Sequence, residues 1–276
     1  MKFILELNQV SKQFGGIKAV RDLSVEFKQG KITALIGPNG AGKTTAFNLI
    51  GGLLRPDSGS VTFNGTRLLG KKPWHIASLG IGRLFQDIRL FRKMTVLENV
   101  MTAFQHQEGE SLWRVMLAPW TEFKPEAKRK DQAMSLLEKV GLAEKAEALT
   151  ENLSYGQQKL VAITRLLAAD AKLLLLDEPT AGVNPVMICQ LLATIKQLAA
   201  EGRTIIFVEH NMEVVRELAE WVIFMSAGRM MTVGKPHDVL ADPNVRAAYI
   251  GRRYDDLHEG QKSNSWIKSG MPHAET

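Results

Sequence analysis

The sequence contains a single cysteine and no long apolar segment. Because Cys189 stands alone, an internal disulfide and a cysteine-based metal cluster are excluded, and its apolar surroundings favour a small buried side chain. No segment reaches the ~18 consecutive apolar residues that a membrane-spanning helix needs. Glu6, Asn8 and Gln9 interrupt the apolar N-terminus, which therefore lacks the core of a signal peptide. We expect a cytosolic chain whose contact with a membrane depends on a partner.

Acidic residues are scarce where basic residues gather. The net charge of +6 comes from 35 basic and 29 acidic residues, and between Lys71 and Lys93 only Asp87 opposes the basic side chains. No interleaved aromatic pattern or recognised nucleic-acid-binding module accompanies these charges, so we expect no nucleic-acid partner. A solvated face near a membrane-embedded partner or anionic lipid headgroups is the favoured interpretation.

Strand and helix patterns divide the chain into three parts. Over the first ~65 residues short strands alternate with turns, and Asn64-Gly65 is typical of a hairpin. Helix formers dominate from about residue 94 to 165, and strand and helix patterns alternate thereafter. Strands are expected at residues 4–10, 20–27, 32–36, 60–63, 172–177, 203–208 and 221–225, and helices at 45–54, 125–140, 185–202 and after Asn211. This order predicts an α/β protein with a mainly parallel sheet, helices on both of its faces and a helical insertion.

A phosphate-binding loop pattern, G-x-x-x-x-G-K-[ST], is complete in residues Gly37, Pro38, Asn39, Gly40, Ala41, Gly42, Lys43 and Thr44. It stands between an expected strand and an expected helix, as the motif requires. Glycines let successive backbone N–H groups turn toward a phosphate, and the helix N-terminus adds the positive end of its dipole. Lys43 can then reach the outer phosphates, and the Thr44 hydroxyl can ligate Mg²⁺. The alternative is a glycine-rich turn that binds nothing, but the complete pattern in this setting predicts a nucleoside triphosphate.

Residues suited to hydrolysis are expected at one edge of the sheet. Four leucines precede Asp177, which can hold Mg²⁺, and Glu178, which can orient or deprotonate the attacking water. His210 follows a neighbouring strand and can donate a hydrogen bond to the γ-phosphate. Gln86 can ligate Mg²⁺ and contact the water while it sits on a hinge. The alternatives are a carboxylate pair that caps a loop and a histidine with a structural role.

A second helix start offers a second anion site. Ser154 and the backbone around Gly156 and Gln157 precede a helix-like segment. One chain does not need two phosphate cradles for one nucleotide, so we expect this surface to serve the ATP of a facing subunit. The alternative is that Ser154 is simply a helix N-cap.

Taken together, these segments resemble an ATP-binding cassette ATPase, the motor subunit of an ABC transporter. The resemblance runs from about residue 5 to 251, and the motifs follow the family's order of Walker A, Q-loop, signature, Walker B, D-loop and H-loop. It implies the ABC ATPase fold: a P-loop NTPase core at about 1–90 and 166–251, an N-terminal antiparallel β subdomain and a helical subdomain at about 91–165. Residues 252–276 are expected to form a flexible tail. The family also implies ATP and Mg²⁺ as cofactors, Phe14 as the ring that stacks on adenine, and Thr45 as a further phosphate contact.

Two departures from the family pattern accompany features of one subfamily. Tyr155 replaces the commonest glycine of the signature, and Asn184 replaces the usual aspartate of the D-loop. Four segments, at residues 83–91, 94–100, 181–185 and 242–251, look like the ATPases of branched-chain, or hydrophobic, amino acid importers. The chain is most similar to the longer of the two ATPases in one importer. The resemblance implies a second ATPase subunit, identical or different, integral membrane permeases, an extracytoplasmic solute-binding protein, and a place at the cytoplasmic face of the inner membrane.

Several other functions remain as alternatives. ATPases of urea and short-amide importers share these features, and the ATPase of lipopolysaccharide export is a more distant relative. A GTPase would carry an Asn-Lys-x-Asp stretch, which is absent. Soluble ABC proteins of DNA repair insert a long coiled coil, and those of translation carry two cassettes; this chain has neither.

Overall fold

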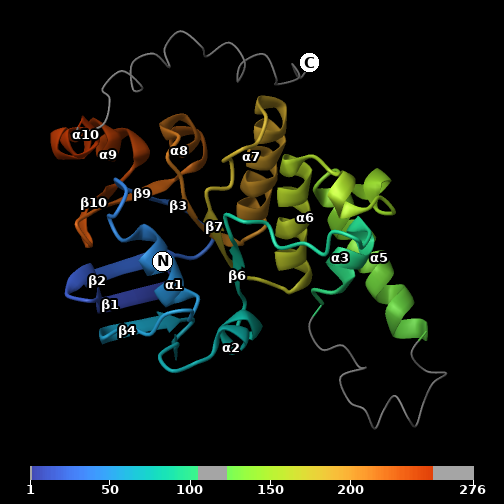
Figure 1. The fold of residues 1–276 in the computed structure, drawn as a ribbon, viewed down its shortest axis with the longest axis horizontal. Coiled ribbons are helices and arrows are strands. Elements are labelled where there is room, and N and C mark those ends of the chain that lie inside the picture. Colours follow the sequence, from blue (N-terminus) through green and yellow to red (C-terminus); the bar gives the residue numbers. More distant parts are fainter. Residues whose placement is uncertain (1, 105–122, 251–276) are drawn as a thin grey trace.

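The computed structural model of the protein describes residues 2–104 and 123–250 (Figure 1). The strands are β1 (Phe3–Phe14), β2 (Ile17–Lys28), β3 (Ile32–Ile36), β4 (Ser58–Phe63), β5 (Thr66–Arg67), β6 (Ile81–Leu84), β7 (Leu173–Asp177), β8 (Thr204–Val208), β9 (Trp221–Ser226) and β10 (Arg229–Gly234). The helices are α1 (Lys43–Ile50), α2 (Pro73–Ser78), α3 (Val96–Met101), α5 (Phe123–Lys139), α6 (Tyr155–Ala168), α7 (Pro185–Ala200), α8 (Met212–Leu218), α9 (Pro236–Ala241) and α10 (Pro243–Ile250), with two short 3-10 helices, η2 (Ala143–Lys145) and η3 (Thr150–Asn152).

Two sheets organise these elements. The N-terminal sheet is antiparallel, in the order β2-β1-β4-β5, and Asn64-Gly65 forms the expected hairpin turn with positive φ at both residues. The larger sheet has the order β10-β9-β3-β8-β7-β6 and is parallel except at β10, which pairs antiparallel with β9. The predicted α/β class, with an antiparallel N-terminal sheet beside a mainly parallel one, is confirmed.

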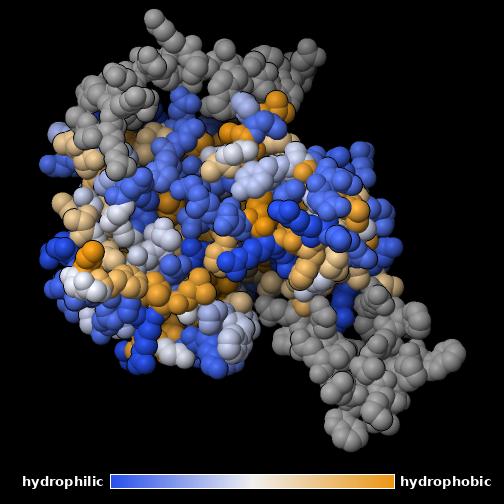
Figure 2. Space-filling model, viewed as in Figure 1, coloured by the Kyte–Doolittle hydropathy of each residue, from blue (hydrophilic) through white to orange (hydrophobic). Residues whose placement is uncertain are grey.

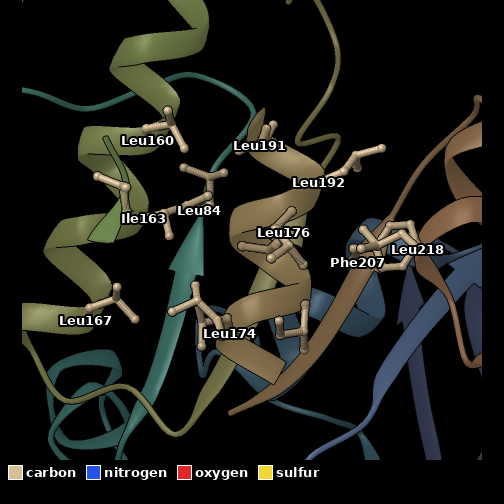
Figure 3. Close-up of a cluster of buried hydrophobic side chains, with 14 of the residues drawn as sticks. Leu84, Leu160, Ile163, Leu167, Leu174, Leu176, Leu191, Leu192, Phe207 and Leu218 are labelled. Carbon is tan, nitrogen blue, oxygen red and sulfur yellow. The ribbon is translucent and has the colours of Figure 1, made fainter. Parts of the chain in front are cut away.

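The central strands are buried on both faces, as four consecutive leucines predict. Leu174 and Leu176 of β7 pack in one hydrophobic cluster with α6 and α7 (Figure 3), whereas Leu173 and Leu175 pack in a second cluster with α1 and the N-terminal sheet. All four leucines are fully buried. This alternation fixes the register of β7, because a shift by one residue would exchange the two faces.

Some sequence expectations need correction. Helix α1 begins at Lys43 and ends at Ile50, earlier than the expected 45–54, because Gly51 and Gly52 terminate it and Gly52 adopts a positive φ. Strands β6 and β10 had no matching expectation: β6 has only four residues, and β10 alternates between exposed and half-buried positions at the sheet edge. Cys189 on α7 is only partly buried. The expected tail, residues 252–276, lies outside the described residues.

In the part of the chain that the structure describes, none of the helices is long and apolar enough to cross a bilayer. On the face drawn in Figure 2, hydrophilic and hydrophobic residues are interspersed.

Candidate active site

The phosphate-binding loop joins the buried strand β3 to the N-terminus of α1. Its first and last glycines have positive φ and lie against other backbone segments. A Cβ on Gly37 would lie 2.1 Å from the Met225 carbonyl oxygen, and one on Gly42 would lie 2.3 Å from the Ala19 carbonyl oxygen. A side chain at either position would therefore collide with β9 or β2, so glycine is required by packing as well as by conformation.

Lys43 is held inside this loop. Its side chain is buried, and Nζ donates hydrogen bonds to the carbonyl oxygens of Gly37 and Pro38 at 2.6 and 3.0 Å. Burial lowers the pKa of Lys43, while the charges of Glu178 and Asp177 act in the opposite direction. The ammonium group is thus fixed at the centre of the loop beside two carboxylates.

A pocket of about 520 Å³ opens over the loop. It is lined by Ile17, Lys18, Ala19, Arg21, Asn39, Gly40, Ala41, Gly42, Lys43, Thr44, Thr45, Glu178, Val208, His210 and Ala227. The structure therefore places most of the predicted phosphate contacts and two of the predicted catalytic residues around one cavity. The contribution of β2 was missed, because its residues reach the loop only when the N-terminal sheet folds over it.

Some predicted nucleotide contacts lie outside the pocket lining. Phe14, at the end of β1, has 45% of its surface exposed and is not a lining residue, although it pairs with Ile17, which is. Ser154, Gly156 and Gln157, at the start of α6, are not lining residues either.

Two of the three predicted catalytic residues, Gln86 and His210, contact the carboxylate of the third, Glu178. Gln86 Nε2 donates to Glu178 Oε2 at 3.2 Å, and His210 Nε2 lies 3.2 Å from Glu178 Oε1. Glu178 follows β7 directly and has a φ of 48°, the left-handed region that non-glycine residues rarely adopt. Its backbone N–H donates to the Val208 carbonyl oxygen at 3.0 Å, so β8 holds the turn in this conformation.

Asp177 forms an ion pair with an arginine, Arg83, which the sequence analysis did not predict. Arg83 of β6 donates from Nη2 to Asp177 Oδ2 at 2.9 Å and from Nη1 to Asn48 Oδ1 of α1 at 2.6 Å. The Arg83 and Asp177 side chains are only 9% and 11% exposed. The sequence signal was weak: Arg83 stands three residues before Gln86, but nothing local shows that β6 pairs with β7.

Oxygen ligands suited to Mg²⁺ are present, but they form no closed cage. Thr44, Asp177 and Gln86 offer hydroxyl, carboxylate and amide oxygens, which hard divalent cations prefer. Within residues 2–104 and 123–250, no group of three or more His, Cys, Asp or Glu side chains could hold a metal ion. These residues therefore fit an ion that shares its coordination with phosphate oxygens and water, the usual arrangement for Mg²⁺.

Glu209 is a further buried carboxylate that the sequence interpretation passed over. Its Oε1 accepts hydrogen bonds from the Thr180 N–H and hydroxyl at 2.8 and 2.6 Å, and its Oε2 accepts from the His210 N–H at 3.2 Å. Glu209 thus ties the loop after β7 to the end of β8. The sequence feature that could have identified Glu209 was its position between the predicted strand and His210.

At the start of α6, Ser154 is a helix N-cap within a capping box. Ser154 Oγ accepts from the Gln157 N–H at 3.3 Å, and Gln157 Oε1 accepts from the Ser154 N–H at 3.1 Å. A hydroxyl that accepts one bond still has its own proton to donate, so capping leaves Ser154 able to contact a phosphate. Gly156 packs tightly against α7, because a Cβ there would lie 2.9 Å from the Met187 Cβ.

Comparison with known proteins agrees with this geometry. The family described as ABC transporter matches residues 20–181. The probable branched-chain amino acid transport ATP-binding protein LivG of Archaeoglobus fulgidus is 37% identical over 93% of this chain and 99% of its own length. The high-affinity branched-chain amino acid transport ATP-binding protein LivG of Salmonella typhimurium is 36% identical over 90% and 98%.

Solved structures show the same fold. The ADP conformation of MJ1267, an ATP-binding cassette of an ABC transporter, superposes with a TM-score of 0.79 at 33% identity, over 91% of this chain and all of its own. The dimeric post-hydrolysis structure of the cassette MJ0796, bound to ADP and Pi, gives a TM-score of 0.69 at 26% identity over 84% and 99%. This chain belongs to the ABC transporter family and is one of its ATP-binding cassettes.

Proposed function

We propose that this chain is the ATP-hydrolysing motor subunit of an importer for branched-chain or other hydrophobic amino acids. The observation that carries the proposal is the convergence of Gln86 and His210 on the Glu178 carboxylate at the mouth of the phosphate-binding loop. The cargo is taken from the names of the relatives, which cover nearly the whole chain.

In this mechanism the loop binds and orients the triphosphate. Backbone N–H groups within residues 39–44 face its oxygens, with Thr45 as a further contact, and Lys43 neutralises the outer phosphates from inside the loop. Thr44, Asp177 and Gln86 would hold Mg²⁺, which would supply positive charge beside the phosphates. Phe14 stacks on adenine, since its strand partner Ile17 lines the pocket.

Glu178 acts as the general base toward the attacking water. Gln86 and His210 approach its carboxylate through different oxygens, at 3.2 Å each, and so restrict its orientation. Each carboxylate oxygen has a second lone pair with which to accept the water proton. His210, at the pocket wall, also donates to the γ-phosphate.

A second copy or a second cassette completes the site. Ser154, Gly156 and Gln157 form a phosphate-binding helix start that does not line the chain's own pocket, and the similar cassette MJ0796 is dimeric. In a head-to-tail dimer these residues contact the ATP bound to the facing subunit. The helical segment at about 91–165 moves as a subdomain against the core at about 1–90 and 166–251 when the dimer closes.

The complete transporter needs membrane partners. Integral permeases hold the chain at the cytoplasmic face of the inner membrane, and an extracytoplasmic solute-binding protein delivers the cargo. The segment after Gln86 contacts a permease helix and transmits the motion of closure.

The central test is Glu178→Gln in the purified full chain. Loss of a general base lowers kcat by about 10²- to 10⁴-fold, while ATP binding persists and the ATP-bound dimer accumulates. Phosphate release measures the first effect, and analytical ultracentrifugation with and without ATP measures the second. Glu144→Gln, at an exposed position on η2, is the matched control and should behave as wild type. Wild-type turnover by Glu178→Gln would reject the assignment.

The cargo needs a separate measurement. Deleting the gene should abolish uptake of labelled leucine, and restoring the wild-type gene, but not the Glu178→Gln form, should recover it. Uptake of leucine that is unchanged while uptake of urea is lost would reject the amino acid proposal and favour the short-amide alternative.

A further inference from the structure

Helix α6 makes polar contacts with the catalytic loops of its own chain. Tyr155, in the first turn, donates from its hydroxyl to the Gln86 carbonyl oxygen at 3.1 Å. Its ring lies against the loop after β7, because a Cβ on Gly182 would lie 3.3 Å from the Tyr155 Cε1. The residue that departs from the commonest signature sequence therefore touches two loops that carry catalytic groups.

One turn further along α6, Lys159 reaches the same region. Its side chain is 1% exposed, and Nζ donates to the carbonyl oxygens of Glu178 and Ala181 at 2.8 Å each. The ammonium also lies 5.1 Å from the centre of the Tyr155 ring. Residues four apart share one face of a helix, so Tyr155 and Lys159 form one continuous contact surface on α6.

A third contact holds the segment that follows Gln86. Arg165 Nη1 donates to the Arg89 carbonyl oxygen at 2.6 Å, and its guanidinium lies 5.4 Å from the Phe91 ring. Tyr155 and Arg165 therefore attach α6 to both ends of residues 86–91. Helix α6 also packs against α3, α5 and α7 (Figure 1), so these loops are fastened to the helical part of the molecule.

Packing alone does not explain why a buried lysine makes these hydrogen bonds. Burying an ammonium group is costly, and an apolar side chain of similar size would fill the space at least as well for stability alone. Lys159 instead binds the carbonyl of the catalytic residue itself, where the backbone is in the left-handed region. A rigid shift of α6 would therefore move the carbonyls of Gln86 and Glu178 directly.

We propose that α6 couples the two nucleotide sites of the dimer, with Tyr155 and Lys159 as its positioning residues. Ser154 caps the N-terminus of this helix and contacts the facing subunit's ATP, and the helix holds the two loops that position Gln86 and Glu178 in its own site. Arrival of ATP in the facing subunit thereby sets the geometry for hydrolysis in this one. This inference rests on the proposed head-to-tail dimer.

The test compares the full chain carrying Tyr155→Phe or Lys159→Met with the wild type, alone and with any second cassette that co-purifies. Losing one hydrogen bond in Tyr155→Phe, or two in Lys159→Met, should lower kcat by about three- to tenfold and leave the KM for ATP unchanged, because the chain's own pocket is intact. The Hill coefficient for ATP should fall toward 1. Lys159→Arg, which keeps the charge and donors, should restore most of the activity. Thr164→Val is the matched control, since its buried hydroxyl bonds only to Leu160 within α6.

Hydrogen exchange separates this inference from the dimer on which it rests. In the Glu178→Gln background, ATP should protect peptides covering residues 84–94 and 178–184. Tyr155→Phe should remove the first protection and Lys159→Met the second, while ultracentrifugation still detects the dimer. If the dimer forms and both protections persist with an unchanged Hill coefficient, the coupling role is wrong. If no ATP-dependent dimer forms in the Glu178→Gln background without these changes, the proposed function itself fails.

Discussion

Asp177 belongs to a sequence motif, but its ion-pair partner comes from a distant part of the chain. The motif predicts a carboxylate at the end of β7, and the structure adds Arg83 as its counter-ion, with Asn48 on the other side of the guanidinium. The pair bridges β6 and β7 beside the helix that follows the phosphate-binding loop. Arg83 therefore restricts the orientation of the Asp177 carboxylate.

Arg83→Met should destabilise the protein strongly. Removing one partner of a buried ion pair leaves the other charge uncompensated, which costs about 3–5 kcal/mol in the free energy of unfolding. Urea denaturation measures the change. Lys31→Met is the matched control, because Lys31 and Glu220 form a pair whose side chains are 44% and 41% exposed, and its loss should cost about 0–1 kcal/mol. Equal effects in the two variants would contradict the buried-pair argument.

Lys159 should make stability depend on pH in a defined window. Burial lowers its pKa from 10.5 to about 8, against the raising effect of Glu209 and Glu178. Between these two values the unfolded chain binds more protons than the folded chain, so the free energy of unfolding rises with pH, by at most about 1.4 kcal/mol per pH unit. The difference between wild type and Lys159→Arg, measured by urea denaturation from pH 7 to 10, isolates this effect. A flat or falling difference would show that burial does not control the charge of Lys159.

Strand β7 contributes both to the hydrophobic core and to the candidate active site. Its leucines alternate between the two hydrophobic clusters, and this double burial holds the strand end that carries Asp177 and Glu178. The glycines at the ends of the phosphate-binding loop are constrained in a comparable way by β2 and β9. The catalytic loops are thus supported by the rigid centre of the sheet.

Leu176→Ala should measure that support. The side chain is fully buried between α6 and α7 (Figure 3), and truncating such a leucine costs about 2–5 kcal/mol. Val233→Ala is the control on the edge strand β10, where the side chain is 51% exposed and the loss should be well under 1 kcal/mol. Thermal or urea unfolding with ATP absent gives both values. A cost below 1 kcal/mol for Leu176→Ala would mean that the cluster closes over the gap.

For the molecule as a whole, the decisive question is whether one chain suffices. Ser154→Arg should leave ATP binding to the isolated chain intact, since Ser154 does not line its own pocket, and should abolish ATP-dependent dimerisation and hydrolysis. Equilibrium binding of a fluorescent ATP analogue and ultracentrifugation separate the two effects. Wild-type hydrolysis by Ser154→Arg would show that the cassette works alone.

Lys43→Ala is the opposite case, because it removes the cation inside the loop and should weaken ATP binding itself.

Local sequence patterns were enough to predict the phosphate-binding loop, the two carboxylates at the end of β7, the N-caps at Ser154 and Asn184, and the mainly parallel sheet. Each of these depends on residues close together in the chain: glycines at fixed spacing, a strand of leucines, or a side chain that accepts a hydrogen bond from an N–H three residues on, as Asn184 does from Met187. The helix predicted after the loop extended too far at its C-terminal end, because Gly51 and Gly52 were not recognised as ending it.

Which residues from distant parts of the chain contact one another depends on the folded arrangement of the strands and helices. Arg83 and Asp177 are 94 residues apart in the chain, and Tyr155 and Gln86 are 69 apart. Their contacts follow from the strand order β6-β7-β8 and from the packing of α6, which arise from burying both faces of the sheet at once. No local pattern encodes that order, so the partners of the predicted residues had to come from the fold.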